Sequence, residues 1–218
     1  MTKFGFTALV ALGALTLTAC ETTPYYATLG ALGIQKSELL VDRVDDARAS
    51  QRNTILALER ARAVHARVAA AEPGKLELAY RDLEDAYDNA SDKAKAFDSD
   101  IVSIKRVAAD LFNEWNDDLA KFEDAELRAA SEAEMMAARA RYDTLIARLD
   151  QTDAALTPVL TAFRDRTLLL KHNMNSDATA KLMADQADVD AKVTAALAEL
   201  DASIAAATTF VAEAKSQA

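Results

Sequence analysis

Few residue types that do chemistry occur in this chain. It has two histidines, His65 and His172, and a single cysteine, Cys20. Neither histidine has another ligand-type residue beside it at metal-binding spacing, and there is no nucleophile elbow and no glycine-rich phosphate loop. His65 shares an apolar helical stripe with Gln51, which favours a buried, hydrogen-bonded side chain over a metal ligand. We therefore expect a protein that is not an enzyme and binds no metal.

Carboxylates are abundant on one early segment. They occur on consecutive helical turns at Glu38, Asp42, Asp45 and Asp46. Such a cluster could bind a divalent cation, but Arg43 and Arg48 stand among the acids at helix-pairing spacing. A solvated, ion-paired helix face is therefore the favoured interpretation.

The amino end has the pattern of a secretory signal. Lys3 precedes an uncharged apolar run over residues 4–17, which is shorter than the about 20 residues that a membrane-spanning helix needs. The run ends in Leu17-Thr18-Ala19-Cys20, which resembles a bacterial lipobox, the motif whose cysteine is acylated. An ordinary signal peptide or an uncleaved anchor are the alternatives. We predict a signal peptide over residues 1–19, and a lipid anchor and tether over 20–35. The acyl lipid on Cys20 would be the only attached group, with no other cofactor.

The residue after the cysteine bears on the membrane that receives the anchor. It is Glu21, and by resemblance to other Gram-negative lipoproteins this favours the outer membrane, on its periplasmic side, with the inner membrane as the alternative. The net charge of the chain is −10, so attraction to anionic headgroups does not hold it at a membrane. The lipid has to supply the anchoring.

Composition predicts the fold class. The chain is rich in alanine, and from Lys75 to Ala218 it contains no glycine and only one proline, Pro158. A sheet needs turn residues at short intervals, so an all-β or α/β fold is nearly excluded. The acidic balance also argues against a nucleic-acid partner, because that function needs clustered Lys and Arg.

Apolar residues spaced alternately by four and three predict an all-α protein with long helices. The expected elements are a helix over 35–71, a turn over 72–75, a helix that runs unbroken over 76–157, a new start or kink at Pro158, and a last helix from the polar cluster 173–177 to about residue 214. We expect one domain, 36–218, in the form of an elongated antiparallel helical hairpin or a three-helix coiled-coil-like rod. Apolar stripes left uncovered would favour a dimer.

Two patches differ from the regular apolar spacing of the predicted helices. The first, beside the lipid, contains Tyr25, Tyr26 and Lys36, where paired tyrosines could lie at the membrane interface or merely cap the rod. The second contains Lys171, His172, Asn173 and Asn175, which could form a recognition surface. Helix termination is the favoured alternative there, because asparagine is a common capping residue.

The same patches carry a family resemblance. The segment from Tyr25-Tyr26 to Leu39-Leu40-Val41-Asp42-Arg43-Val44, together with Leu170-Lys171-His172-Asn173-Met174-Asn175, resembles the signatures of an uncharacterised Gram-negative lipoprotein family, the domain of unknown function 2959. Met174 and Ser37 depart from the pattern. The resemblance covers the mature chain and implies a lipid-anchored, all-helical protein facing the periplasm. It brings no catalytic residues and no substrate, and its signatures add Asp42 and Arg43 to the candidate interaction residues.

These observations favour a scaffold or adaptor of the cell envelope that presents a helix face to a protein partner or to a second copy of itself. The first alternative is a BAR-like helical dimer that shapes or tethers the membrane. The second alternative is a carrier of a ligand or metal in a pocket between helices near His172.

Overall fold

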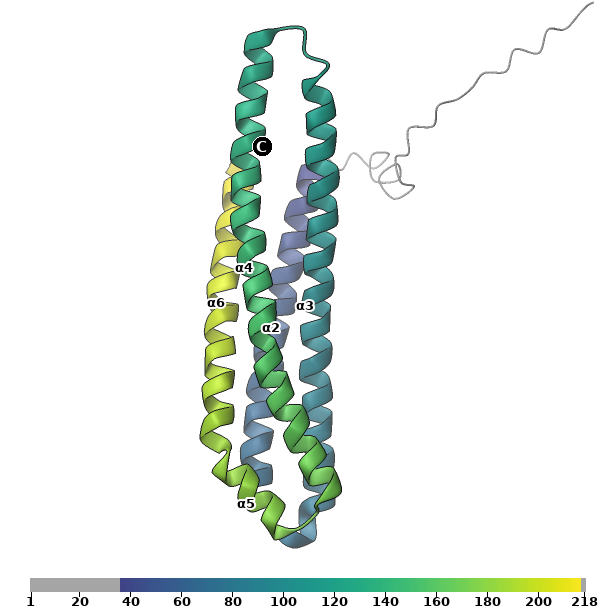
Figure 1. The fold of residues 1–218 in the computed structure, drawn as a ribbon, viewed down its shortest axis with the longest axis vertical. Coiled ribbons are helices and arrows are strands. Elements are labelled where there is room, and N and C mark those ends of the chain that lie inside the picture. Colours follow the sequence, from purple (N-terminus) through teal and green to yellow (C-terminus); the bar gives the residue numbers. More distant parts are fainter. Residues whose placement is uncertain (1–35, 217–218) are drawn as a thin grey trace, which may run out of the picture. The chain divides into compact units, whose positions relative to one another are not determined.

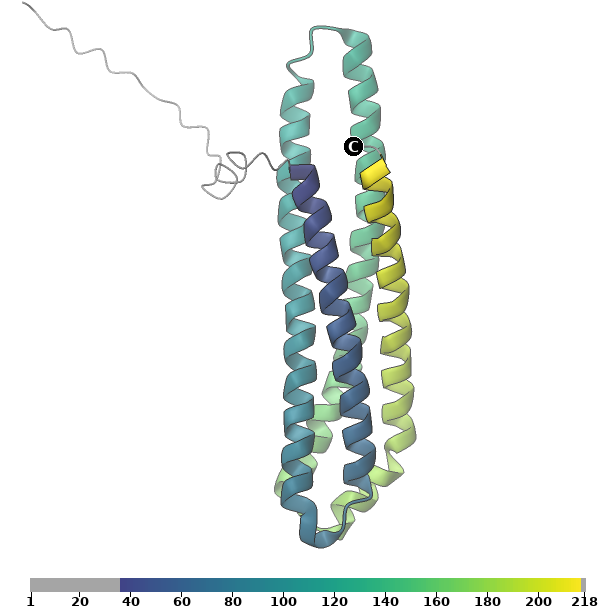
Figure 2. The same ribbon diagram turned by 180° about the vertical axis from the view of Figure 1, so that it is seen from behind.

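The computed structural model describes residues 36–216, and over this range the chain is helical, with short turns and no strand (Figures 1 and 2). The elements are α2 (Lys36–Ala69), the 3-10 turn η1 (Pro73–Lys75), α3 (Leu76–Leu119), α4 (Ala125–His172), the short α5 (Ser176–Ala184) and α6 (Gln186–Ser216). The predicted all-α class is confirmed. The predicted lipid site Cys20, the tether and the tyrosines Tyr25 and Tyr26 lie outside the described residues.

Helices α2, α3, α4 and α6 form an antiparallel bundle, and α5 links α4 to α6 at one end (Figure 1). Contacts between neighbouring helices fix their direction. Lys36 at the start of α2 lies 2.6 Å from Glu114 near the end of α3, while Arg67 at the end of α2 faces Asp82 near the start of α3. The same reversal relates α4 to α6, because Arg166 near the end of α4 pairs with Asp188 at the start of α6 (3.3 Å), while the earlier Arg148 pairs with the later Glu199 (3.0 Å).

The core follows the four-three spacing of the sequence. On α2 the buried positions include the complete predicted stripe: Leu40, Val44, Ala47, Gln51, Thr54, Leu58, Ala61, His65 and Val68. Phe97 on α3, and Leu149 and Phe163 on α4, fill the centre and are fully buried. The last helix is long and apolar enough to cross a membrane by composition alone, but one of its faces, including Val193 and Leu200, packs into this core.

The predicted unbroken helix over 76–157 is wrong. The chain reverses at residues 120–124, so two antiparallel helices replace one long helix, and a four-helix bundle replaces the predicted hairpin or three-helix rod. The turn needs neither glycine nor proline, because Asp124 caps the new helix. Its Oδ1 accepts hydrogen bonds from the backbone N–H groups of Glu126 (2.8 Å) and Leu127 (3.1 Å).

The predicted helix start at Pro158 is also wrong, since α4 runs through this residue. A proline inside a helix lacks the N–H that would bond the preceding turn and usually bends the helix. Pro158 is exposed, so water can solvate the carbonyl that loses its partner. In Figures 1 and 2 the second half of α4 slants across the bundle towards α5.

Helices α3 and α4 continue beyond the start of α2 and the end of α6 (Figures 1 and 2). We call residues 113–136 of this projecting pair the hairpin end. Every residue from 121 to 130 is exposed. At the base of the hairpin end, α2 begins at Lys36 beside Glu114, and Lys215 near the end of α6 lies 3.7 Å from Asp45 on α2.

Candidate interaction site

The predicted recognition patch lies where α4 ends and α5 begins, and we call it the α4–α5 corner. Lys171, His172, Asn173 and Asn175 are exposed there and lie together. The Lys171 ammonium lies 6.0 Å from the centre of the Tyr80 ring and 3.9 Å from the Glu84 carboxylate, so α3 holds this side chain in place.

The two asparagines of the α4–α5 corner complete helix ends. The Asn173 side-chain amide donates to the carbonyl of Leu169 (3.2 Å), and the Asn175 side-chain oxygen accepts from the backbone N–H of Ala178 (3.0 Å). These bonds satisfy backbone groups that a helix end leaves open. Helix termination therefore accounts for both asparagines, while the recognition role of this corner stays a prediction.

The other predicted interaction residues lie near the opposite end of the bundle. Lys36 pairs with Glu114, Arg43 pairs with Asp46 at 2.8 Å, and Asp42 is exposed on the first turns of α2. In Figure 1 the start of α2 lies near the hairpin end and α5 lies at the other end. The structure therefore does not join the two predicted patches into one site.

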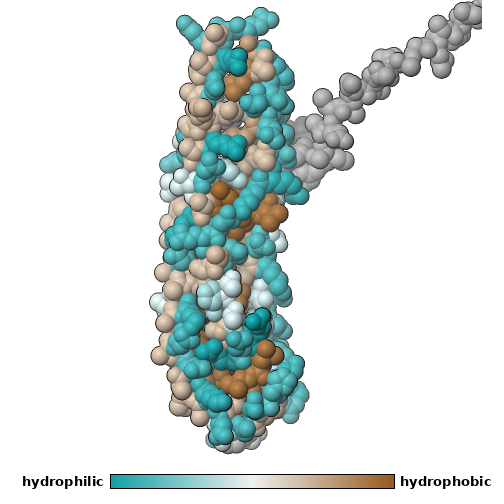
Figure 3. All heavy atoms as spheres, in the orientation of Figure 1, coloured by the Kyte–Doolittle hydropathy of each residue, from teal (hydrophilic) through white to brown (hydrophobic). Residues whose placement is uncertain are grey.

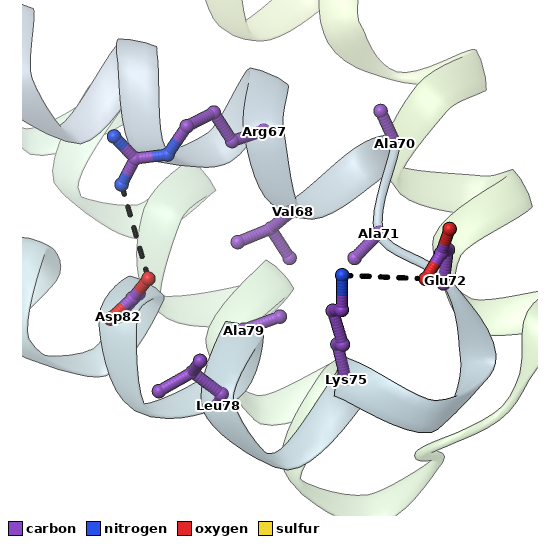
Figure 4. Close-up of a pocket in the computed structure, with 9 residues that line it drawn as sticks. All are labelled: Arg67, Val68, Ala70, Ala71, Glu72, Lys75, Leu78, Ala79 and Asp82. Atoms are coloured by element: carbon purple, nitrogen blue, oxygen red, sulfur yellow. Dashed lines mark ion pairs between the residues drawn. The ribbon is translucent and has the colours of Figure 1, made fainter.

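A shallow pocket of about 310 Å³ lies at the turn between α2 and α3 (Figure 4). In Figure 4, Arg67 faces Asp82 on one side, Lys75 faces Glu72 on the other, and Val68, Leu78 and Ala79 lie between these pairs. The charged groups are exposed and paired with each other, so the pocket presents no concentrated charge to a ligand. Across residues 36–216, no three His, Cys, Asp or Glu side chains gather as metal ligands.

A polar layer crosses the core. The Nδ1 atom of His65 hydrogen-bonds the side-chain oxygen of Gln186 at 2.8 Å, and the imidazole contacts the Phe163 ring edge-on. His65 is fully buried, and burial lowers its pKa below the ordinary 6.5, with Arg166 acting in the same direction. The prediction of a buried, hydrogen-bonded histidine is confirmed. These contacts join α2 to α4 and α6.

The hairpin end is the surface that sequence reasoning missed. Trp115 is half-buried, and its Nε1–H donates to the Ser131 hydroxyl at 2.9 Å across the two helices. Phe122 is 40% exposed, Leu127 58% and Met136 64%. Figure 3 shows a hydrophobic patch between the two projecting helices beneath a hydrophilic tip. The sequence signal was Asp124, a helix-capping residue type, before an alanine- and glutamate-rich stretch.

One family model matches the chain: it is described as "Protein of unknown function (DUF2959)" and covers residues 25–214. No curated protein and no solved structure matches.

Proposed function

The chain belongs to the DUF2959 family, as its two signatures predict, and from this premise we propose that it is a lipid-anchored interaction protein of the cell envelope, faces the periplasm and has no catalytic role. The observation that carries the proposal is the hairpin end. Large apolar side chains are also exposed on the body of the bundle, at Leu56, Leu78 and Val102, and around the α4–α5 corner, at Leu168, Met174 and Met183. At the hairpin end, two helices stand without the pair that covers them elsewhere, and large apolar side chains are exposed. Such a surface is typical of a contact with another molecule.

The sequence supports the anchor. Cys20 ends a lipobox-like motif, and only the residues between it and Lys36 separate it from the bundle. Helix α2 starts at the base of the hairpin end. The chain that follows an anchor on Cys20 would therefore continue into the bundle at the end that carries the exposed apolar surface.

Metabolic labelling with an alkynyl fatty acid tests the anchor. We expect the label on the natural chain and in the outer-membrane fraction, and we expect Cys20→Ser to remove it. An unlabelled natural chain, or a label that survives Cys20→Ser, would contradict lipid anchoring at this residue.

Photo-crosslinking in cells tests the interaction role. A photoreactive residue replaces Leu127 in the hairpin end or Lys171 in the α4–α5 corner, and Val102 provides a control that is equally exposed (59%) on the body of α3. We expect recurrent envelope proteins to be trapped from Leu127 and not from Val102. Trapping from Lys171 alone would move the interaction to the α4–α5 corner. Trapping of lipid alone, with vesicle deformation by the anchored chain, would favour membrane shaping instead.

A further inference from the structure

We infer that the hairpin end binds a basic amphipathic helix of a partner protein over the sides of α3 and α4 that carry Trp115 and Leu127. This inference deepens the proposed interaction role, on which it rests, by naming the surface and the class of partner.

The first argument is that an apolar stripe on α4 continues past the end of α6. On α4 the stripe that buries Leu149 and Leu145 continues towards the hairpin end through Tyr142, Ala138, Met135 and Ser131 to Leu127, in steps of three or four residues. Leu149 and Leu145 are buried where α6 lies beside them, whereas Leu127 is 58% exposed. A helix face of this kind gains stability when another helix covers it.

The side chains opposite extend the same surface on α3. Trp115 lies half-buried against Ser131, and Leu119 follows it one turn later as a buried residue. Phe122 in the turn is 40% exposed. The half-buried Trp115 and the exposed Phe122 and Leu127 thus lie at one end of this helix pair, where a single amphipathic helix can cover them. The twelve residues of α4 in the hairpin end span about 18 Å, or three helical turns.

Charge selects the partner. The hairpin end contains eight acidic and two basic residues, so it holds −6 of the net −10 of the whole chain. Lys121, one of the two bases, already pairs with Asp118 at 2.7 Å. The hydrogen bond with Asp118, with the added charges of Asp117 and Glu114, raises the pKa of Lys121 above its ordinary 10.5. Acidic side chains therefore predominate around Lys121, although Lys36 pairs with one of them, Glu114.

A negative rim around an apolar strip attracts Lys- and Arg-rich helices and repels other acidic surfaces. It disfavours a second copy of the hairpin end, which would bring like charges together. It also disfavours an anionic lipid surface. A helix with leucine-type residues on one face and lysine or arginine on its flanks satisfies both the apolar strip and the rim.

The test uses the emission of Trp115, the only tryptophan in the chain, which lies within the surface itself. The full chain in non-ionic detergent is titrated with a Leu/Lys amphipathic peptide of about 18 residues, roughly five helical turns. A scrambled Leu/Lys peptide and an amphipathic Leu/Glu peptide serve as ligand controls. We expect a saturating change in emission with the amphipathic Leu/Lys peptide only, weakened by salt.

Variants then locate the binding. We expect Leu127→Ser and Glu134→Lys each to weaken binding by about tenfold, because one removes an apolar contact and the other reverses a rim charge. Leu78→Ser (62% exposed, at the far end of α3) and Asp201→Lys on α6 are matched controls and should bind like the natural chain. Circular dichroism checks that all four variants keep their helicity.

Three results would overturn the inference: equal binding of the scrambled peptide, equal loss in the control variants, or no change in emission. Self-association of the natural chain that Leu127→Ser abolishes, seen by sedimentation, would also overturn it and assign the surface to a second copy. These readouts are separate from the labelling and crosslinking tests. Failure of the titration therefore leaves the proposed function standing, and failure of lipid labelling leaves the titration interpretable.

Discussion

The side-chain amide of Gln51 on α2 donates a hydrogen bond to the hydroxyl of Ser203 on α6 across 2.6 Å, and both side chains are fully buried. The two residues lie 152 positions apart in the chain, so this bond joins its first described helix to its last. A slip of either helix would leave both polar groups in an apolar core without a partner. The pair therefore fixes the register of α2 against α6.

Removal of one side chain of this pair should lower the free energy of unfolding more than replacement of both side chains. We expect Ser203→Ala to lower the free energy of unfolding by about 1 to 3 kcal/mol, because it leaves the Gln51 amide buried and unsatisfied. The double variant Gln51→Leu/Ser203→Ala should recover most of this loss. Urea denaturation followed by circular dichroism measures both, with the exposed Thr194→Ala on α6 as control. Additive losses in the double variant would contradict a coupled pair.

Substitution of two leucines that lie two residues apart on α2, and so point to different sides of the helix, should affect stability very differently. Leu58 is fully buried and Leu56 is 64% exposed. We expect Leu58→Ala to lower the free energy of unfolding by about 2 to 5 kcal/mol, because it opens a cavity, and Leu56→Ala to change it by at most about 0.5 kcal/mol. Thermal and urea unfolding measure both. A similar effect from the two substitutions would show that α2 packs through a different face.

Stability should fall in mild acid because of His65. Burial is the main reason that its pKa lies below the ordinary 6.5 in the folded chain, so the unfolded chain binds a proton first as the pH falls. The contribution of neutral His65 to the free energy of unfolding is complete above about pH 6.5, the ordinary pKa of histidine. It is lost as the pH falls from there towards the lower pKa of His65 in the folded chain. Denaturation midpoints between pH 7.5 and about pH 5 measure the slope.

The charged groups near His65 are Arg166 on α4 and Asp185 and Asp190 beside Gln186. The carboxylates favour the charged imidazole but do not outweigh burial. We expect His65→Gln to flatten the slope in this range and the exposed His172→Gln to leave it unchanged. A slope that persists in His65→Gln would assign the acid sensitivity to other groups.

The hairpin turn should depend on its cap. Asp124→Ala removes the acceptor of two backbone N–H groups, and we expect a loss of about 1 kcal/mol. Hydrogen exchange should show faster amide exchange at the start of α4, while the bundle body stays protected. Glu123→Ala, one residue earlier and exposed, is the control. Equal exchange in the two variants would mean that the turn forms without this cap.

Pro158→Ala should stabilise the chain. The exposed proline interrupts the hydrogen bonding of α4, and alanine restores it. We expect a gain of about 1 to 3 kcal/mol, with Thr157→Ala as a neutral control. A loss of stability on Pro158→Ala would show instead that the proline is required for the packing of α4.

Much of the fold could be predicted from the sequence, because regular apolar spacing leaves one consistent stripe for each helix. The complete α2 stripe, the turn after Ala69 and the buried state of His65 follow from this spacing. The reversal at residues 120–124 could not be predicted in the same way. Prediction relied on glycine and proline to mark turns, and here a single aspartate side chain supplies the cap while the neighbours are good helix formers.

The candidate site could be predicted only in part. Lys171, His172, Asn173 and Asn175 do lie together, because they fall within five residues of the chain at one helix end. The hairpin end was missed since it depends on the relative lengths of four helices, and no short motif encodes where α2 and α6 stop beside α3 and α4. Leu127 and Met136 are ordinary helix residues in sequence, and only the absence of neighbouring helices makes them notable.

The order of the helices also has a kinetic consequence. Helix α3 packs on α2 and on α4, each of which is its neighbour along the chain, so these contacts close short loops and form rapidly. The contact between α2 and α6 includes Gln51 and Ser203, which lie 152 positions apart. Because it closes a long loop of chain, this contact should form late. Before that step, a nascent chain that ends ahead of Gln186 exposes the apolar faces that α6 covers. Binding by chaperones should therefore concentrate on chains truncated before this helix.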